Sequence, residues 1–110
     1  MSLRFTTDAT FEADVLRSGR PVLVDFTADW CPPCKMVAPV LAQIDTDLGD
    51  QLDVLSLDVD QNPEVTRRYG VMSMPTLALF VNGEIVVQMV GARPRTAIVK
   101  AIEPHLAARV

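Results

Sequence analysis

The fold of this chain is decided by the stretch PVLVDFTADWCPPCK, residues 21–35. Residues 21–26 form a run of β-branched and apolar side chains, which is typical of a strand buried on both faces of a sheet. Cys31 and Cys34 follow at once, and residues 36–48 have the pattern of a helix that stops before Gly49. The stretch therefore predicts a buried strand that runs directly into a helix, with two cysteines at the junction.

Further elements are predicted on both sides of this stretch. We expect helices over residues 8–16, 62–69 and 96–108, and strands over residues 54–59, 76–81 and 84–90. Thr7 or Asp8 is the expected N-cap of the first helix, and Asn82-Gly83 is a strong signal for a hairpin between the last two strands. These elements predict an α/β fold, with a central mixed β-sheet flanked by helices on both faces.

Two prolines are expected to disturb the helices that contain them. Pro39 lies inside the helix over residues 36–48, where it removes a backbone donor and should kink the helix. Pro104 lies inside the helix over residues 96–108, where we expect a bend or an early end.

Composition bounds the class of protein. The chain has 110 residues, of which 49% are hydrophobic and 22% charged, so we expect a single domain over residues 1–110, and by default a monomer. A net charge of −4 with interleaved acids and bases argues against a nucleic-acid partner or an anionic membrane surface. The N-terminal residues lack the pattern of a secretory signal, and the apolar stretches are too short to cross a bilayer. We therefore expect a cytoplasmic protein.

The Cys31–Cys34 pair predicts thiol–disulfide chemistry. At a helix start, Cys31 lies near unpaired backbone N–H groups and the positive end of the helix dipole. Both favour a thiolate, so we expect a lowered pKa for Cys31, which would make it the attacking nucleophile, with Lys35 adding a nearby positive charge. Cys34, one turn into the helix, is expected to be more buried and less acidic. Its expected role is to attack the mixed disulfide that Cys31 forms with a substrate.

Two alternatives for the pair remain open but are disfavoured. A structural zinc site needs four ligands, and only His105 is available as a further His or Cys, so we expect no metal. An inert structural disulfide is also disfavoured, because so short a loop adds little stability.

Asp25 interrupts the apolar run that precedes the cysteines. A carboxylate in a buried strand is costly, and burial raises its pKa because desolvation disfavours the charged form. The functional interpretation is a general base that takes the proton from Cys34 and returns it in the reverse step. The alternative is a surface aspartate on an edge strand. We favour the functional interpretation, because perturbed carboxylates cluster at reactive sites.

Several motifs together resemble the thioredoxin family over nearly the whole chain. They are VDF at 24–26, WCPPCK at 30–35, DQNP at 60–63, YGV at 69–71, MPT at 74–76, FVNGE at 80–84 and VGA at 90–92. The resemblance implies the thioredoxin fold and the reduction of protein disulfides through a reversible Cys31–Cys34 disulfide. It also implies Asp25 as the buried proton acceptor. No cofactor is expected to be bound, since the resemblance implies a separate thioredoxin reductase that draws on NADPH.

The resemblance further implies where substrate binds. On its own, Pro75 is ordinary for a strand start, and only about 5–6% of X–Pro bonds in folded proteins are cis. The family implies a cis Met74–Pro75 bond that faces the cysteines. An extended substrate backbone would pair with residue 74 in a shallow apolar groove. The residues implied for this groove are Trp30, Met74, Pro75, Val90, Gly91 and Ala92.

Three departures from the family pattern bear on the site. The usual Gly-Pro between the cysteines is Pro32-Pro33 here, which should strain position 32 and removes an N–H that would face a sulfur. We therefore expect a reduction potential that differs, in either direction, from the value of about −270 mV for thioredoxin. Thr27 replaces a usual tryptophan, and Ser56 replaces a frequent lysine. Without that lysine, the pKa of Asp25 should rise further, with Ser56 offering only a neutral hydrogen bond.

The sequence therefore predicts a protein-disulfide reductase. Two other functions remain: a specialised thioredoxin-like oxidase or isomerase, whose Pro-Pro motif suits another direction of exchange, and a non-catalytic binding subunit of a larger complex.

Overall fold

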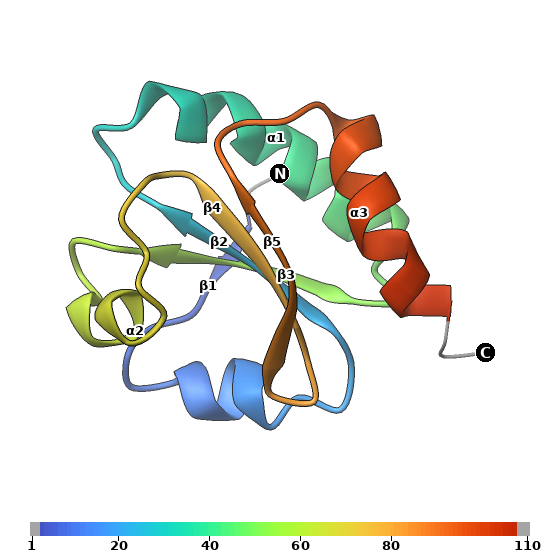
Figure 1. The fold of residues 1–110 in the computed structure, drawn as a ribbon, viewed down its shortest axis with the longest axis horizontal. Helices are drawn as coiled ribbons and strands as arrows, with labels where there is room; N and C mark the ends of the chain where they lie inside the picture. Colours follow the sequence, from blue (N-terminus) through green and yellow to red (C-terminus); the bar gives the residue numbers. More distant parts are fainter. Residues whose placement is uncertain (1–2, 108–110) are drawn as a thin grey trace.

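A computed structural model describes residues 3–107 of the chain, and its centre is a five-stranded mixed sheet (Figure 1). The strands are β1 (Arg4–Phe5), β2 (Val22–Thr27), β3 (Asp53–Asp58), β4 (Thr76–Val81) and β5 (Glu84–Val90), in the order β1-β3-β2-β4-β5. β3 pairs in parallel with β1 and β2, whereas β4 is antiparallel to both β2 and β5. The predicted mixed sheet is confirmed, and the strand that precedes the cysteines is its central strand.

Helices cover both faces of this sheet, as predicted. α1 (Pro32–Asp47) and α3 (Arg95–Ala107) lie on one face, and α2 (Pro63–Arg68) lies on the other with η1 (Glu12–Leu16), a short π-helical turn (Figure 1). No helix within residues 3–107 is long and apolar enough to span a bilayer.

The sheet separates two apolar clusters, because successive side chains of a strand point to opposite faces. Val22, Val24 and Phe26 of β2 pack in the cluster that includes residues of η1 and α2. The cluster on the other face fills the space beneath α1 and α3 and includes Leu23, Leu41, Ile44, Leu79, Ile98 and Ile102. By the same alternation, Asp25 lies on the face of Leu23 and points toward α1.

The N-terminal region differs from the prediction. The helix expected over residues 8–16 is only the short turn η1, and neither Thr7 nor Asp8 is its N-cap. Instead, the carboxylate of Asp8 accepts hydrogen bonds from the backbone N–H groups of Glu64 and Val65, at 3.1 and 2.9 Å, and so caps α2. The two-residue strand β1 was not predicted, because two residues carry no recognisable periodicity.

The proline and hairpin positions test the remaining local predictions. α1 begins at Pro32, so position 32 is helical although a proline follows it, and the first helical position is where proline is best tolerated. α3 continues past Pro104 to Ala107, so an early end there is wrong, while the predicted last residue, Ala108, lies outside the described residues. Asn82 and Gly83 have φ angles of 52° and 81°, which confirms the predicted hairpin turn between β4 and β5.

Candidate active site

The junction between β2 and α1 brings the two cysteines together. Cys31 is the N-cap of α1 and Cys34 lies one turn into the helix; the two form a disulfide with a Cα–Cα distance of 5.3 Å. The extended backbone of Cys31, with φ −103° and ψ 103°, lets its Sγ accept a hydrogen bond from the Cys34 N–H at 3.3 Å. A sulfur therefore occupies the place that a hydroxyl or carboxylate oxygen takes in an ordinary N-cap.

The Pro-Pro pair changes how many donors this helix start offers. Four N–H groups at the start of a helix have no partner within it, here those of positions 31–34. Pro32 and Pro33 have no N–H, and the Cys31 N–H donates to the Ala28 carbonyl at 3.2 Å. The Cys34 N–H is thus the single donor left for the Cys31 sulfur. No acidic side chain lies in the first turn to offset the helix dipole.

The loop before β4 covers Cys31 from the other side. The Met74–Pro75 bond is cis, as the family resemblance implies, and the Met74 carbonyl oxygen lies 3.6 Å from Cys31 Sγ. Pro75 in turn accepts a 2.8 Å hydrogen bond from the Gly91 N–H, which ties the end of β5 to the same loop. Val90 is paired with Thr76 in the sheet, so Val90 and Gly91 lie against the segment that brings Met74 to Cys31, and the exposed Ala92 follows them.

Both cysteines are almost fully covered. Each exposes only 2% of its surface, so the expectation that Cys34 is the more buried of the two is wrong for the oxidised pair. Both belong to the apolar cluster that also contains residues of η1 and α2, so the interior covers Cys31 as completely as Cys34. The neighbouring prolines Pro32 and Pro33, and also Lys35, are exposed.

Large apolar side chains are exposed on the chain segments around the disulfide. Trp30 exposes 64% of its surface, Met72 90% and Val90 52%. The Trp30 Nε1–H donates to Asp60 Oδ2 at 2.8 Å, which fixes the indole beside the disulfide. Exposed apolar surface of this kind commonly marks a site where another protein binds.

Asp25 lies behind the cysteines in the central strand and is only 1% exposed, so the edge-strand alternative is wrong. Burial raises its pKa from 3.8 to about 7, and a hydrogen bond with Ser56 opposes that rise in part. Ser56 is the direct neighbour of Asp25 in the register of β2 and β3. The direction of the pKa shift is the one that a carboxyl group in a buried strand predicts.

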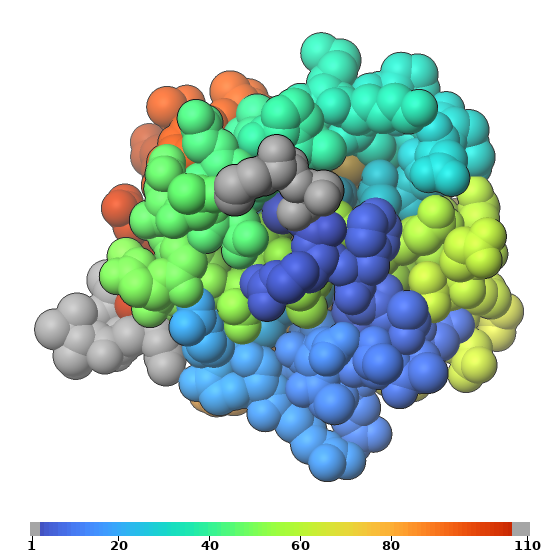
Figure 2. All heavy atoms as spheres, turned by 180° about the vertical axis from the view of Figure 1, so that it is seen from behind, coloured from blue at the N-terminus to red at the C-terminus, as the bar shows by residue number. Residues whose placement is uncertain are grey.

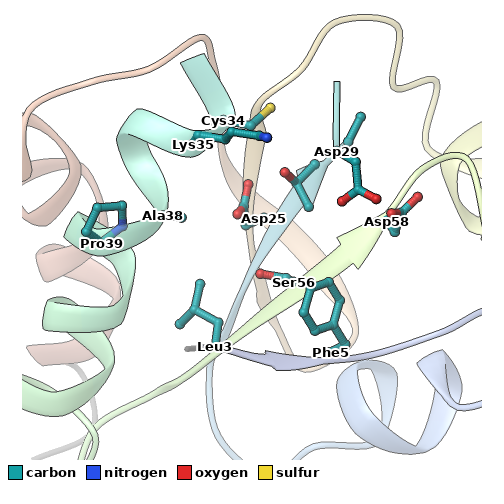
Figure 3. Close-up of a pocket in the computed structure, with 12 residues that line it drawn as sticks. Leu3, Phe5, Asp25, Asp29, Cys34, Lys35, Ala38, Pro39, Ser56 and Asp58 are labelled. Carbon is teal, nitrogen blue, oxygen red and sulfur yellow. The ribbon is translucent and has the colours of Figure 1, made fainter. Parts of the chain in front are cut away.

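A cavity of about 340 Å³ joins Asp25 to Cys34. Figure 3 shows the Asp25 carboxyl group directed from β2 toward the turn of α1 that carries Cys34 and Lys35. Thr27 and Ser56, the two small residues at positions where the family pattern has larger ones, both line it. Figure 2 shows the surface on this side, where the blue N-terminal segment that contains β1 lies below the teal residues of α1.

Sequence reasoning missed part of this lining. Leu3, Phe5, Asp29 and Asp58 were not singled out, although all four line the cavity. Leu3 and Phe5 carried no signal, because the strand to which Phe5 belongs was not predicted. The position of Asp58 could have been recognised from the sequence, because Asp58 stands at the carboxyl end of a predicted strand. Polar residues at the carboxyl ends of adjacent parallel strands meet at one edge of a sheet, where ligands commonly bind.

Comparison with known proteins identifies the family. The thioredoxin family model matches residues 2–104. The chain is 51% identical to the thioredoxin of Streptomyces clavuligerus over 98 residues, which cover 89% of this chain and 91% of that protein. It is 53% identical to the thioredoxin of Mycobacterium tuberculosis (strain ATCC 25618 / H37Rv) over 96 residues, covering 87% of this chain and 83% of that protein.

A third relative is a larger protein. The bifunctional thioredoxin reductase/thioredoxin of Mycobacterium leprae is 54% identical over 94 residues, which cover 86% of this chain and 20% of that protein. The family model, these identities and the disulfide at the start of α1 agree. The chain belongs to the thioredoxin family of protein-disulfide reductases.

Proposed function

We propose that Cys31 is the nucleophile, Cys34 the resolving cysteine and Asp25 the proton acceptor when this thiol–disulfide oxidoreductase reduces a protein disulfide. The observation that carries the proposal is the shared cavity, because it brings the buried carboxyl group of Asp25 and Cys34 together away from Cys31. A carboxyl group whose pKa is about 7 suits proton exchange near neutral pH, since a general base works best when its pKa is close to the operating pH.

The reaction has two exchange steps. The Cys31 thiolate attacks one sulfur of the substrate disulfide, forms a mixed disulfide with it and releases the other substrate sulfur as a thiolate. Cys34 then gives its proton to the Asp25 carboxylate, and the resulting thiolate attacks Cys31 Sγ. This releases the second substrate thiolate and forms the Cys31–Cys34 disulfide seen in the structure. The substrate gains two electrons and the cysteine pair loses two.

The surface around Cys31 is proposed to hold the substrate. Exposed Trp30 and Val90 supply apolar contact, and the Met74 backbone beside Cys31 Sγ supplies a partner for an extended peptide. Pro75, Gly91 and Ala92 complete this surface. Pro32, Pro33, Lys35 and Ser56 are proposed to tune the reactivity of the pair, the prolines by removing two donors from the helix start.

A thioredoxin reductase that uses NADPH is the proposed source of electrons for the next cycle. The Mycobacterium leprae relative supports this partner, since its name combines thioredoxin reductase and thioredoxin in one protein. We further propose that the chain acts as a single domain, as a monomer and in the cytoplasm.

Reduction of insulin tests the direction of the exchange. With NADPH and a bacterial thioredoxin reductase, the protein should reduce insulin disulfides catalytically, and replacing both cysteines by serine should abolish the reaction. An oxidase or isomerase, whose dithiol form is the more stable one, would instead accumulate as the dithiol without reducing insulin. A pure binding subunit would retain its function after the double replacement.

The proton-acceptor role is tested on the resolving step. In a single-turnover measurement with a preformed mixed disulfide on Cys31, Asp25→Asn should slow release of the substrate thiol about 10²-fold, the lower end of the range for general acid–base catalysis. Asp29→Asn is the matched control, because Asp29 lines the same cavity and makes the same chemical change. Equal rates for the wild type and Asp25→Asn would refute the role, whereas weaker substrate binding alone would not support it.

A further inference from the structure

The cavity beside Cys34 has the size and composition of a small-molecule site. Its volume of about 340 Å³ far exceeds the space of roughly 30 Å³ that one water molecule takes, and it falls in the range of about 300–1,000 Å³ typical of ligand pockets. One wall is apolar and comes from two elements that are distant in sequence, with Leu3 and Phe5 near β1 and Ala38 and Pro39 on α1 (Figure 3).

The buried side chain of Asp25, which lines the cavity, has a carboxyl oxygen without a partner. Asp25 is 99% buried, since only 1% of its surface is exposed, and its Oδ1 accepts no hydrogen bond from any residue among 3–107. Buried carboxyl oxygens without a donor are rare, because desolvation is not repaid by a hydrogen bond. Because Asp25 lines the cavity, a bound molecule that reaches its carboxyl group can supply a donor to it.

The charged side chains that line the cavity indicate which charge a bound molecule would carry. Three carboxyl groups, those of Asp25, Asp29 and Asp58, face one ammonium group, that of Lys35. None of these four side chains forms an ion pair within the part of the chain that the structure describes. Asp58 is held in place by hydrogen bonds from the backbone N–H groups of Asp60 and Gln61, at 2.9 and 3.1 Å. The excess of carboxyl groups favours a cation.

The spacing of the carboxyl groups distinguishes an organic cation from a metal ion. Across residues 3–107, no three His, Cys, Asp or Glu side chains converge closely enough to hold a metal. The ring of Phe5, by contrast, lines the cavity and is 62% exposed, so it offers a face on which an organic cation is stabilised. The apolar wall has no use in binding a bare ion.

We propose that this cavity binds a small organic cation, whose apolar body packs against Phe5, Ala38 and Pro39 and whose ammonium or amidinium head donates a hydrogen bond to Asp25. Binding and ionisation of Asp25 are then coupled, because the cation binds the carboxylate more tightly than the neutral acid. By thermodynamic reciprocity, the bound ligand shifts the protonation equilibrium of Asp25 toward the carboxylate by the same factor. This inference goes beyond the proposed role of Asp25 and does not require it.

Benzamidine is a suitable probe, and neutral benzamide of nearly the same shape is its control. In NMR titrations of the oxidised protein at about pH 8, where Asp25 is mainly ionised, benzamidine should bind at least about tenfold more tightly than benzamide. The shifted amides should lie in residues 25–29, 35–39 and 56–58. Equal affinities of the two probes, or shifts confined to other residues, would overturn the proposal.

The coupling between ligand binding and ionisation of Asp25 allows a second measurement, at the carboxyl carbon of Asp25. The carboxyl carbon of Asp25, followed by NMR against pH, should titrate about one unit lower with saturating benzamidine if the carboxylate binds the probe tenfold more tightly than the acid does. Asp25→Asn should reduce the preference for benzamidine over benzamide, because the amidinium head then loses its carboxylate partner. If the pKa of Asp25 is unchanged in protein saturated with benzamidine, the amidinium group does not contact the carboxyl group, and the proposal is wrong.

Filling the cavity separates this site from weak binding elsewhere on the surface. Ala38→Leu places a larger side chain in the lining and should abolish benzamidine binding, whereas Ala97→Leu on α3, at a position of similar exposure, should leave it unchanged. Retained binding in Ala38→Leu would refute the proposal. All these measurements use the oxidised, resting protein, so their failure would leave the disulfide reductase function and the base role of Asp25 untouched.

Discussion

Two neighbouring rows of side chains cross the face of the sheet beneath α1, and they differ in kind. The first row is Leu23, Val54 and Leu79. The second row is Asp25, Ser56 and Leu77, two residues later on β2 and β3 and two residues earlier on the antiparallel β4. Both rows are buried. The first is wholly apolar and belongs to a packed cluster, whereas the second places a carboxyl and a hydroxyl group beside a cavity. The same strands thus carry one row that stabilises the fold and a second row that contains the proposed proton acceptor.

The buried carboxyl group of the second row lowers the stability of the folded state when it is ionised. A rise of about three pKa units in Asp25 corresponds to roughly 4 kcal/mol between its charged and neutral forms, which the apolar packing elsewhere has to offset. Apolar packing does not account for a buried carboxyl group at this position, whereas the proposed role of Asp25 in the reaction at the cysteines does. The following predictions test whether the two rows are separable in this way.

The largest expected effect is on the pH dependence of stability. The folded state binds the Asp25 proton more tightly than the unfolded state, so this contribution is full below about pH 4 and is lost as the pH rises through about 7. From pH 4 to 8, the free energy of unfolding of the wild type should fall by roughly 4 kcal/mol relative to Asp25→Asn. Urea unfolding of both proteins at a series of pH values measures this difference, and parallel pH profiles would show that Asp25 is ionised at no energetic cost.

The next effect concerns the first row. Leu23→Ala should lower the free energy of unfolding by about 2–5 kcal/mol, because it leaves a cavity in a fully buried cluster. The rate of insulin reduction per folded molecule should stay within about twofold of the wild type, since Leu23 belongs to the apolar cluster that contains neither cysteine. Comparable losses of stability and of rate would mean that the rows do not act separately.

A smaller effect is expected at Ser56, the neighbour of Asp25 in the second row. Its hydrogen bond lowers the pKa of Asp25, so Ser56→Ala should raise that pKa further, by about one unit or less for a bond worth about 1 kcal/mol. NMR titration of the Asp25 carboxyl carbon measures the change. Ser56→Thr retains the hydroxyl group and should restore the wild-type value; a lower pKa in Ser56→Ala would contradict the account.

Local patterns sufficed for much of this fold, and contacts between distant residues account for the rest. The predicted hairpin strands match β4 and β5 at every boundary, because Asn82-Gly83 fixes the turn between them. The role of Asp8 was not predictable, since the helix that it caps begins more than 50 residues later.

In the candidate site, too, some features follow from local sequence and others depend on contacts between distant residues. The cysteine pair and Asp25 stand close together in one stretch, so the central strand and the following helix predict their proximity. The cavity that joins Asp25 to Cys34 depends on Leu3 and Phe5, which reach it only because β1 pairs with β3. No local pattern indicates that pairing.

The central claim is that the start of α1 favours the thiolate of Cys31 while Asp25 serves Cys34. It is tested most directly by following alkylation of each cysteine of the reduced protein against pH, with peptide mass spectrometry to distinguish the two. The account predicts that Cys31 reacts first and loses its proton at the lower pH, and that Asp25→Asn alters the titration of Cys34 more than that of Cys31. Two thiols that titrate together and react equally slowly at neutral pH would contradict it.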